Sequence, residues 1–248
     1  MTILVIIPAR MASTRLPGKP LAHIEGRAMV LRVVDIARRA ELGEIAVAAG
    51  DEEIKRAVEE DGVRCAMTDP DLPSGTDRVR AAAAILDPDG DADIIVNLQA
   101  DAPLLSPDEL RRAAELLKRD ARFDVATLAA PVPAHQIAED ADAVKAVIAL
   151  DDGEKTGRAL YFSRAAVPHG AETLFYHVGV YAYRRAALDR FCALPPSPLE
   201  RMEQLEQLRG LENGFAYGVA VIDHAPPSVD TPDDLEKARA LFRDRAKR

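Results

Sequence analysis

The sequence predicts an α/β fold with a doubly wound, mainly parallel sheet and an inserted antiparallel section. Two observations carry this prediction. From Thr2 to Arg119, short apolar runs rich in β-branched residues alternate with segments of helical spacing. This β-α-β alternation favours parallel strands joined by right-handed crossovers. From Val125 onward the pattern is less regular, and Tyr176–Arg184 alternates apolar and polar residues as a half-buried strand does.

Predicted strands and helices follow one another through the first half of the chain. Thr2–Ile7 is an apolar run that we expect to stop at Pro8, as a short buried parallel strand. An Asp cap begins the helix Asp51–Asp61, and Ser106 caps a later helix. The predicted order is strand Thr2–Ile7, helix Ala28–Ala40, strand Glu44–Ala49, helix Asp51–Asp61, strand Val63–Met67, helix Thr76–Leu86, strand Ala92–Leu98 and helix Pro107–Arg119.

The second half contains fewer clear signals. Pro198–Glu212 has helical spacing that places Leu199, Met202, Leu205 and Leu208 on one stripe. No low-complexity linker or internal repeat interrupts the chain, so we expect residues 1–248 to form a single domain. The other predicted elements are the strands Val125–Ala130, Ala143–Leu150, Ala159–Phe162, Tyr176–Arg184 and Phe215–Ile222 and the closing helix Asp233–Arg245.

The composition excludes several classes of function. A net charge of −9 argues against broad binding to nucleic acid or to an anionic membrane. The apolar run Ile3–Ile7 is far shorter than the roughly 18–20 residues that span a bilayer, and it lacks the basic leader of a secretory signal. We therefore expect a cytoplasmic protein with no membrane insertion, in which Cys65 and Cys192 are reduced and buried.

The loop that follows the first predicted strand is basic. Arg10, Arg15 and Lys19 lie in the first twenty residues, which contain no acidic residue. In open α/β sheets, ligands bind outside the carboxyl ends of the strands, and a triphosphate needs cations and backbone N–H donors there. The loop has neither the GxxxxGK[ST] pattern nor a GxGxxG pattern. With Ser13 and Gly18 allowing close approach, we interpret it as a phosphate-binding loop rather than a solvated basic loop.

A second motif, Ser74-Gly75-Thr76-Asp77-Arg78, opens the predicted helix after the third strand. Gly75 permits close approach of a ligand to the backbone, and Arg78 lies one turn into the helix. Ser74 is suited to cap the helix, so an ordinary helix start explains the motif equally well. Both interpretations stay open from the residues alone.

Two aspartates follow strands in the same way. Asp101 comes directly after the strand that ends at Leu98, and Asp230 follows the last predicted strand. Mg²⁺ prefers one or two carboxylates together with phosphate oxygens and water. We therefore predict that Asp101 and Asp230 hold Mg²⁺, which would polarise a phosphorus centre and neutralise a leaving pyrophosphate. Asp230 has a competing role as a cap of the last helix.

A fourth group of residues combines charge with hydrogen-bond donors and acceptors, as a polyhydroxylated acidic sugar requires. A lone histidine on a strand is more often a structural residue than a ligand contact, so this interpretation competes with a structural one. No histidine pairs with another His or a Cys at zinc-ligand spacing, and we expect no structural zinc. The group consists of Arg164, His177, Tyr181, Glu206 and Gln207.

These residues, in this order, resemble a known family. The pattern Ile7-Pro8-Ala9-Arg10, continued by Ser13-Thr14-Arg15-Leu16-Pro17-Gly18-Lys19-Pro20-Leu21, is similar to the signature of the 3-deoxy-manno-octulosonate cytidylyltransferase family. The basic loop alone would also fit acylneuraminate cytidylyltransferases. Three later segments separate the two families: Leu160-Tyr161-Phe162-Ser163-Arg164, Leu205-Glu206-Gln207-Leu208-Arg209 and Val229-Asp230-Thr231-Pro232.

The resemblance implies that CTP and 3-deoxy-manno-octulosonate (Kdo) give CMP-Kdo and pyrophosphate for lipopolysaccharide biosynthesis. It implies Mg²⁺ as cofactor, a homodimer, and a fold of the nucleotide-diphospho-sugar transferase type whose antiparallel section supports the dimer. Arg10, Lys19, Asp101 and Asp230 would be catalytic, and the two aspartates would hold the metal. The nucleotide would contact Pro8, Ala9, Arg10, Ser13, Arg15, Lys19, Ser74, Gly75, Arg78 and Gln99, and the sugar acid would contact Arg164, His177, Tyr181, Glu206 and Gln207.

The chain departs from the family pattern at three positions. Ala100 and Ala102 flank Asp101 where the family usually has Gly and an acidic or polar residue, and Gly50 stands where a Thr is common. These changes leave the basic loop and both aspartates intact, so we expect an active enzyme. They leave open an 8-amino analogue of Kdo or another 2-keto sugar acid as substrate, and a homologue that binds nucleotide with weakened turnover. A sugar-1-phosphate nucleotidyltransferase is a third alternative, but such enzymes typically carry a G-x-G-T-R loop.

Overall fold

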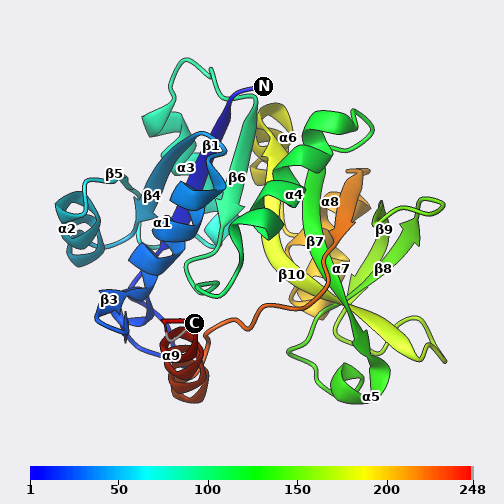
Figure 1. The fold of residues 1–248 in the computed structure, drawn as a ribbon. Helices are drawn as coiled ribbons and strands as arrows, with labels where there is room; N and C mark the ends of the chain where they lie inside the picture. Colours follow the sequence, from blue (N-terminus) through cyan, green and yellow to red (C-terminus); the bar gives the residue numbers. More distant parts are fainter. Residues whose placement is uncertain (247–248) are drawn as a thin grey trace. The chain divides into compact units, whose positions relative to one another are not determined.

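The computed structural model describes residues 1–246, which form two compact units. Unit 1 consists of Met1–Leu110 together with the C-terminal segment from Pro226, and unit 2 consists of Arg111–Ala225. Figure 1 traces the chain from the blue N-terminal strand to the red C-terminal helix. Compactness does not show whether either unit folds alone, so the single domain that we expect over residues 1–248 stays a prediction.

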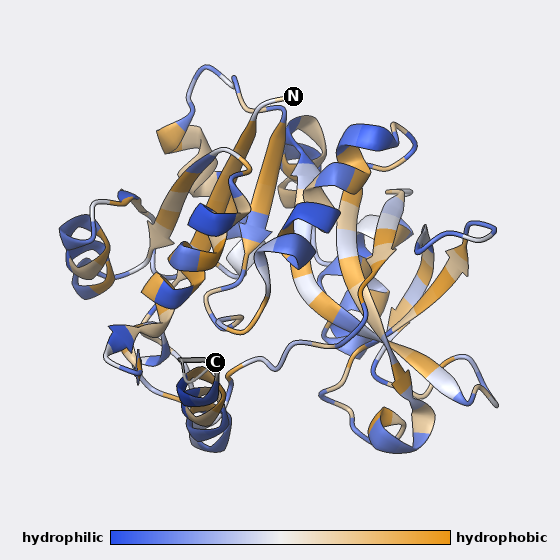
Figure 2. Ribbon diagram, in the orientation of Figure 1, coloured by the Kyte–Doolittle hydropathy of each residue, from blue (hydrophilic) through white to orange (hydrophobic). Residues whose placement is uncertain are grey.

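Unit 1 is built on parallel strands. Its strands are β1 (Ile3–Ala9), β4 (Glu44–Ala49), β5 (Arg64–Met67) and β6 (Ile94–Leu98), in the order β5-β4-β1-β6. Neighbouring strands in this order run parallel to each other. All residues of β1 and β6 are buried, as the continuous apolar runs predict for strands covered on both faces. Figure 2 shows the resulting concentration of apolar residues in these strands.

The expectation that Pro8 stops the first strand was wrong, because β1 continues to Ala9. Ala9 accepts a hydrogen bond from Gly50 on the β4 side, at 2.9 Å, so the preceding residue faces the β6 side. On that side the pairing of β1 with β6 ends at Ile6. No strand partner therefore needs the N–H that Pro8 lacks, and proline is tolerated at this position.

The helices of unit 1 agree with the sequence pattern to within a residue or two. Serine side chains cap two of them: Ser74 accepts from the N–H of Asp77 at 3.1 Å, and Ser106 accepts from the N–H of Glu109 at 3.2 Å. No sequence pattern predicts the short strands β2 (His23–Ile24) and β3 (Arg27–Ala28) or the 3-10 helix η1 (Lys19–Leu21). The helices of unit 1 are α1 (Met29–Ala40), α2 (Glu52–Glu60), α3 (Gly75–Leu86) and α9 (Pro232–Ala246), and α4 (Pro107–Arg119) begins in unit 1 and continues into unit 2.

The C-terminal segment returns to unit 1 and packs near the basic loop. Val229 and Leu235 are buried in one apolar cluster with Ile24, Met29 and Leu104. The N–H of Val229 also donates to the carbonyl of Asp101, at 2.9 Å. Residues that precede α9 are thereby held beside the end of β6, although they lie more than a hundred positions apart in the sequence.

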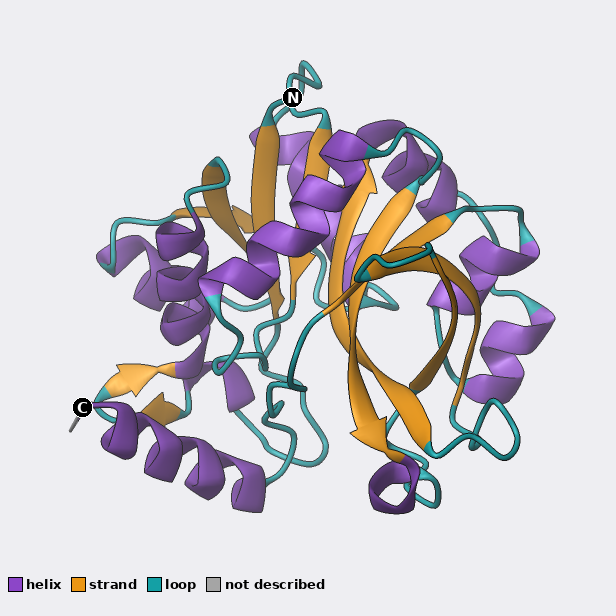
Figure 3. Ribbon diagram, turned by 45° about the vertical axis from the view of Figure 1, so that its right-hand side comes forward, coloured by secondary structure: helices purple, strands orange, loops and turns teal. Residues whose placement is uncertain are grey.

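Unit 2 contains a curled, mostly antiparallel sheet, visible in Figure 3. The strand order is β10-β7-β11-β9-β8, and β8 pairs again with β10, so that the pairings form a continuous ring. β7 and β11 run parallel, whereas the pairs β10–β7, β10–β8, β11–β9 and β8–β9 run antiparallel. The strands are β7 (Val125–Pro133), β8 (Lys145–Leu150), β9 (Thr156–Ser163), β10 (Thr173–Arg184) and β11 (Tyr217–Val221).

The single helix expected over Pro198–Glu212 was wrong. The chain forms α7 (Pro198–Glu203) and α8 (Gln207–Glu212), because Gln204 adopts a left-handed conformation with φ 55° that ends α7. Met202 is 78% exposed and shares no buried stripe with Leu205. Two further helices, α5 (Ala134–Ile137) and α6 (Arg185–Cys192), are not predicted by the sequence pattern.

A close contact between α8 and β11 depends on Gly210. A Cβ atom at this position would lie 2.4 Å from the hydroxyl of Tyr217 and 2.9 Å from its ring. We expect Gly210→Ala to lower the free energy of unfolding by about 1–3 kcal/mol through overpacking, measured by denaturant unfolding. In the Tyr217→Phe background the loss should shrink, because the closest contact is gone. An equal loss in both backgrounds would contradict this account.

Candidate active site

A cavity of about 380 Å³ lies at the carboxyl ends of β1 and β6 in unit 1. The strand order reverses between these two strands, since β1 leads on to β4 on one side while β6 lies on the other. This is the position at which open α/β sheets bind ligands. All the predicted nucleotide and metal residues line the cavity: Pro8, Ala9, Arg10, Ser13, Arg15, Lys19, Ser74, Gly75, Arg78, Gln99, Asp101 and Asp230.

The basic loop is folded back on itself and anchored. Gly18 adopts a left-handed conformation with φ 70° and donates to the carbonyl of Met11, which turns the chain into η1. Asp51 takes the N-cap position of α2 but makes no side-chain cap bond, contrary to the sequence prediction. Its carboxylate instead accepts from the N–H of Met11 at 2.7 Å. A tertiary partner has thus replaced the local one, and it fixes the start of the loop.

Lys19 lies between the two predicted metal ligands. Its ammonium is 2.7 Å from the carboxylate of Asp101 and 3.2 Å from that of Asp230. Burial lowers the pKa of Lys19, but the charges and hydrogen bonds of the two aspartates outweigh burial and raise the pKa above its ordinary value. Arg15 also approaches Asp230, at 3.1 Å. Two carboxylates therefore converge on one small volume that now holds a cationic group.

The alternative role of Asp230 as a helix cap is not the one that the structure shows. Thr231 performs it, since its hydroxyl accepts from the N–H of Asp234 at 3.2 Å at the start of α9. The Asp234 carboxylate accepts from the N–H of Thr231 in return, at 3.1 Å. Asp230 is left to face Lys19 and Arg15. Two convergent carboxylates beside an open cavity fit the donor set of Mg²⁺, which completes its coordination with phosphate oxygens and water.

Arg78 is a buried cation in the cavity wall. It is 2% exposed, and its guanidinium donates to the hydroxyl of Thr68 at 2.6 Å and to the carbonyls of Asp69 and Pro70 at 3.0 and 3.1 Å. Burial and, after it, the charge of Arg10 lower the pKa of Arg78. No carboxylate within residues 1–246 forms a salt bridge with either arginine. The two arginines therefore give the cavity positive charge that no carboxylate in the described part of the chain pairs with, and this charge is suited to bind an anion.

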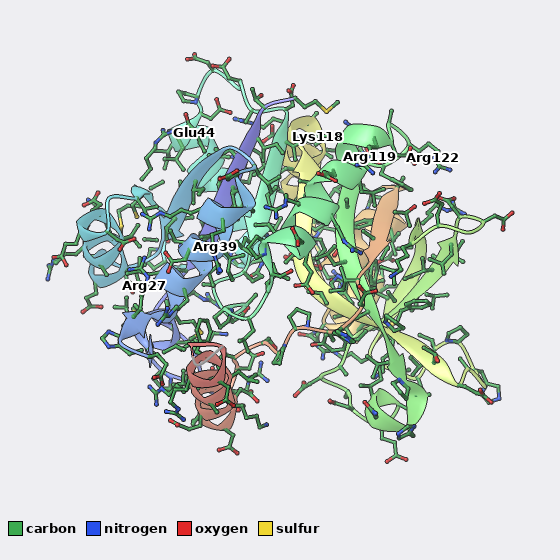
Figure 4. The ribbon with its side chains drawn as sticks, viewed as in Figure 1. Arg27, Arg39, Glu44, Lys118, Arg119 and Arg122 are labelled. Atoms are coloured by element: carbon green, nitrogen blue, oxygen red, sulfur yellow. The ribbon has the colours of Figure 1, made fainter. Side chains whose placement is uncertain are left out.

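Cations elsewhere on the surface differ in this respect. Figure 4 labels several of them, among them Arg27 and Arg122. Arg27 lies 2.7 Å from Asp35, and Arg122 lies 2.6 Å from Asp120. These charges are neutralised by neighbours on the same surface, which distinguishes them from the two cavity arginines.

A chain of amide and hydroxyl groups orients Gln99. Its amide donates to the side-chain oxygen of Asn97 at 3.0 Å, and Asn97 donates to the hydroxyl of Thr76 at 3.2 Å. A Cβ on Gly75 would lie 3.5 Å from the Gln99 amide, which is ordinary van der Waals contact, so Gln99 packs directly against the start of α3. The sequence analysis did not assign a role to Asn97, although an Asn inside the apolar run Ile94–Leu98 is a usable signal.

The predicted sugar residues belong to unit 2. His177 and Tyr181 lie on β10, with their rings 5.5 Å apart, and Phe162 meets the His177 ring edge-on at 5.0 Å. Burial lowers the pKa of His177 to about 4. Burial and then the charge of Glu206 raise the pKa of Tyr181 well above its ordinary value. Glu206 directly precedes α8, and Gln207 begins that helix and is buried.

Arg164 is held by backbone carbonyls. Its guanidinium donates to the carbonyls of Glu203 at 2.7 Å and Ala141 at 2.8 Å, and its N–H donates to the Glu203 carboxylate at 2.9 Å. Its carbonyl accepts from the buried ammonium of Lys145 at 2.7 Å. The sequence analysis missed Glu203 and Lys145, because nothing in the linear pattern connects them with Arg164.

Within residues 1–246, every helix is too short or too polar to span a membrane. No three His, Cys, Asp or Glu side chains gather there as a possible metal site. Cys65 and Cys192 form no disulfide and are of intermediate burial, so the expectation that both are buried was wrong; burial nevertheless raises the pKa of Cys65 to about 11.

Known proteins of one kind are similar to this chain over nearly its whole length. The family described as cytidylyltransferase matches residues 4–221. The 3-deoxy-manno-octulosonate cytidylyltransferases of Parvibaculum lavamentivorans and of a Bradyrhizobium species are each 52% identical. The first match covers 96% of this chain and 92% of the relative, and the second covers 97% of each.

Solved structures agree. A structure of CMP:2-keto-3-deoxy-manno-octonic acid synthetase complexed with CTP has a TM-score of 0.90 at 36% identity and covers 99% of this chain and 100% of its own. A cytidylyltransferase from Leptospira borgpetersenii, at 17% identity and a TM-score of 0.64, shares the fold; the match covers 98% of this chain and 87% of its own. Identity, coverage and fold together show that this chain is an enzyme of the 3-deoxy-manno-octulosonate cytidylyltransferase family, as the motifs of its basic loop and later segments predicted.

Proposed function

We propose that this protein transfers CMP from CTP to the anomeric hydroxyl of Kdo, giving CMP-Kdo and pyrophosphate for lipopolysaccharide biosynthesis. The observation that carries the proposal is the charge pattern of one cavity. Arg10 and Arg78 contribute positive charge without a carboxylate partner, and Asp101 and Asp230 converge beside them. A magnesium-bound nucleoside triphosphate is complementary to both halves of this pattern. The relatives named above act on the same sugar acid, which supports Kdo as acceptor.

In the proposed complex, Arg10, Arg15 and Lys19 bind the triphosphate. The backbone at Pro8 and Ala9 lies near cytosine, and the remaining lining residues Ser13, Ser74, Gly75, Arg78 and Gln99 complete the nucleotide site. Asp101 and Asp230 hold Mg²⁺, which when bound would polarise the α-phosphorus and neutralise charge on the leaving pyrophosphate. Phosphate oxygens would then replace the aspartates as acceptors for Lys19. Catalysis consists of positioning and charge neutralisation, with in-line attack by the sugar hydroxyl and no covalent enzyme intermediate.

The sugar acid would be bound by residues of unit 2. Arg164, His177, Tyr181, Glu206 and Gln207 supply cationic, neutral and anionic groups for a carboxylate and several hydroxyls. With a pKa near 4, the His177 imidazole is neutral at physiological pH and serves as a hydrogen-bonding group rather than as a charge. The guanidinium of Arg164 donates to three carbonyls, those of Glu203, Ala141 and Gln204, and carries five N–H donors in all, so two remain for a ligand.

Several finer expectations belong to the same proposal. The sheet of unit 1 would be doubly wound, and the antiparallel section of unit 2 would support a homodimer. The protein would act in the cytoplasm, where thiols stay reduced. Sedimentation of the purified protein tests the dimer.

The three departures from the family pattern bear on the acceptor. A side chain at Gly50 would begin 2.9 Å from the guanidinium of Arg78 and 3.2 Å from Arg10, so glycine gives these two arginines room. Ala100 is buried, and Ala102 is partly exposed beside Asp101. None of these changes removes a group from the charge pattern that supports the proposal.

Pyrophosphate release tests the function directly. The assay combines CTP and Mg²⁺ with Kdo, with 8-amino-Kdo and with another 2-keto sugar acid, and it repeats the best acceptor with UTP and dTTP. Preference for Kdo and CTP is the expected result. A preference for the amino sugar would change the acceptor but keep the reaction class. CTP binding without release on any acceptor would contradict the enzyme.

We expect Asp101→Asn to lower kcat by roughly 10²-fold or more while CTP binding weakens much less, because the neutral amide is a poor metal ligand. Steady-state kinetics and CTP titration measure the two effects separately. The matched control is Asp89→Asn, an exposed aspartate outside the residues that line the cavity. Unchanged turnover of the Asp101 variant at saturating Mg²⁺ would contradict the proposal that Asp101 holds the metal.

The lowered pKa of His177 has a consequence for stability. Between about pH 4 and 6.5 the unfolded chain binds a proton that the folded protein does not, so folding stability falls as pH falls through this window. The contribution is at most about 3 kcal/mol. The stability of wild type should therefore decline more steeply than that of His177→Gln between pH 6.5 and 4, measured by urea unfolding. The exposed His169, replaced by Gln, is the control, and parallel declines in all three proteins would contradict the assignment.

A further inference from the structure

A β-bulge lies next to His177. The register of β10 with β7 runs regularly to Val178, opposite Leu128, and resumes at Tyr181, opposite Thr127. Two residues of β10 are therefore accommodated between adjacent residues of β7. Bulges of this kind redirect backbone and side-chain groups and are common beside active sites.

The bulge brings two carbonyl oxygens to one hydroxyl. The Oγ1 atom of Thr127 lies 2.8 Å from the carbonyl oxygen of Val180 and 3.3 Å from that of Val178. The same Oγ1 lies 2.9 Å from Nε2 of His177. Thr127 is fully buried and His177 is 7% exposed, so this arrangement is shielded from bulk water.

The hydrogen-bond inventory of these atoms fixes where the protons lie. A threonine hydroxyl has one proton, and carbonyl oxygens only accept. If the Thr127 hydroxyl donated to His177, its oxygen would face the Val180 carbonyl at 2.8 Å with no proton between them. Donation to Val180 instead satisfies the carbonyl and leaves the Thr127 oxygen to accept from His177. Nε2 of His177 must then carry a proton.

The second ring nitrogen follows from the first. A neutral imidazole with its proton on Nε2 has a bare lone pair on Nδ1. The low pKa that burial gives His177 agrees with a neutral ring. The ring makes its one hydrogen bond within residues 1–246 through Nε2, so Nδ1 stays available as an acceptor.

We propose that Thr127 is a positioning residue that holds His177 in the Nε2–H tautomer, so that Nδ1 accepts a hydrogen bond from a hydroxyl of the acceptor sugar. The sugar part rests on the proposed function. A group at this position must be a donor, because a carbonyl or carboxylate oxygen would meet a lone pair. Thr127 thus contributes to acceptor selection although its own hydroxyl makes its hydrogen bonds within the protein and not to the sugar.

Nitrogen NMR of the histidine rings tests the tautomer without any substrate. In wild type at neutral pH, Nε2 of His177 should give a protonated, pyrrole-type signal and Nδ1 an unprotonated, pyridine-type signal. The spectrum of His177→Gln assigns the resonance among the five histidines of the chain. Thr127→Val removes the acceptor at nearly constant volume and should produce a mixture of tautomers, whereas Thr127→Ser keeps the hydroxyl and should retain the wild-type signals. A wild-type Nδ1–H tautomer or a charged ring would overturn the proposal.

Kinetics test the role toward the sugar. Thr127→Val should raise KM for the sugar acid in proportion to the loss of the Nε2–H tautomer, about fivefold if one ring in five keeps it, and leave KM for CTP unchanged. Thr127→Ser should restore the wild-type KM. A changed tautomer with an unchanged sugar KM would overturn the link to the acceptor. Absence of product with wild type on every sugar acid would be a failure of the proposed function, and it would leave the NMR result intact.

A pair of substitutions at His177 keeps the test decisive if Thr127→Val does not fold. An Asn amide ends near the position of Nδ1, and a Gln amide ends near that of Nε2. If Nδ1 meets the sugar, His177→Asn should retain more of the sugar affinity than His177→Gln. The reverse order would overturn the proposal.

Discussion

The compensation of charge around Lys19 is the constraint on which the site of unit 1 depends. Its ammonium joins the loop after β1, the end of β6 and the segment before α9, through Asp101 and Asp230. Without a cation between them, the two carboxylates would repel each other in a partly shielded volume. The Val229–Asp101 backbone bond and the apolar cluster around Met29 keep the same three segments together. Electrostatics and packing therefore support the same arrangement of the three segments. A ligand that brings its own cation can replace Lys19 between the two aspartates without changing this arrangement.

The cavity separates two kinds of charge. On one side, Lys19 and Arg15 neutralise aspartates; on the other, Arg10 and Arg78 have no carboxylate partner. Arg78 is buried and satisfied only by a hydroxyl and carbonyl oxygens, so its charge is poorly screened. An acidic protein can hold a polyanion under these conditions, because the local field and not the net charge determines what binds. Hydrogen bonds to backbone carbonyls fix the orientation of the Arg78 guanidinium before any ligand binds.

Much of unit 1 followed from the sequence, since a parallel strand and the helix after it are each encoded by local patterns. That the candidate nucleotide and metal residues line one cavity could be predicted for a related reason: they follow strands whose carboxyl ends meet at one edge. What failed depended on tertiary partners. The Asp51 carboxylate accepts from the N–H of Met11 instead of capping α2. Pro8 lies within β1, because the pairing of β1 with β6 ends before it. Gln204 ends α7 in the middle of a segment whose apolar spacing predicts one continuous helix. Thr127 could not be found at all, because its role arises from a bulge in a different strand.

The ring of strand pairings in unit 2 closes at His177. Its side-chain neighbours come from β7 and β9, and its backbone N–H donates to the carbonyl of Val144, just before β8, at 2.8 Å. A residue tied in this way from several directions has little conformational freedom left to lose when a ligand arrives. Binding of a ligand to His177 should therefore carry a small penalty in conformational entropy and little induced fit. Acceptors are then selected by how well they match a preformed surface.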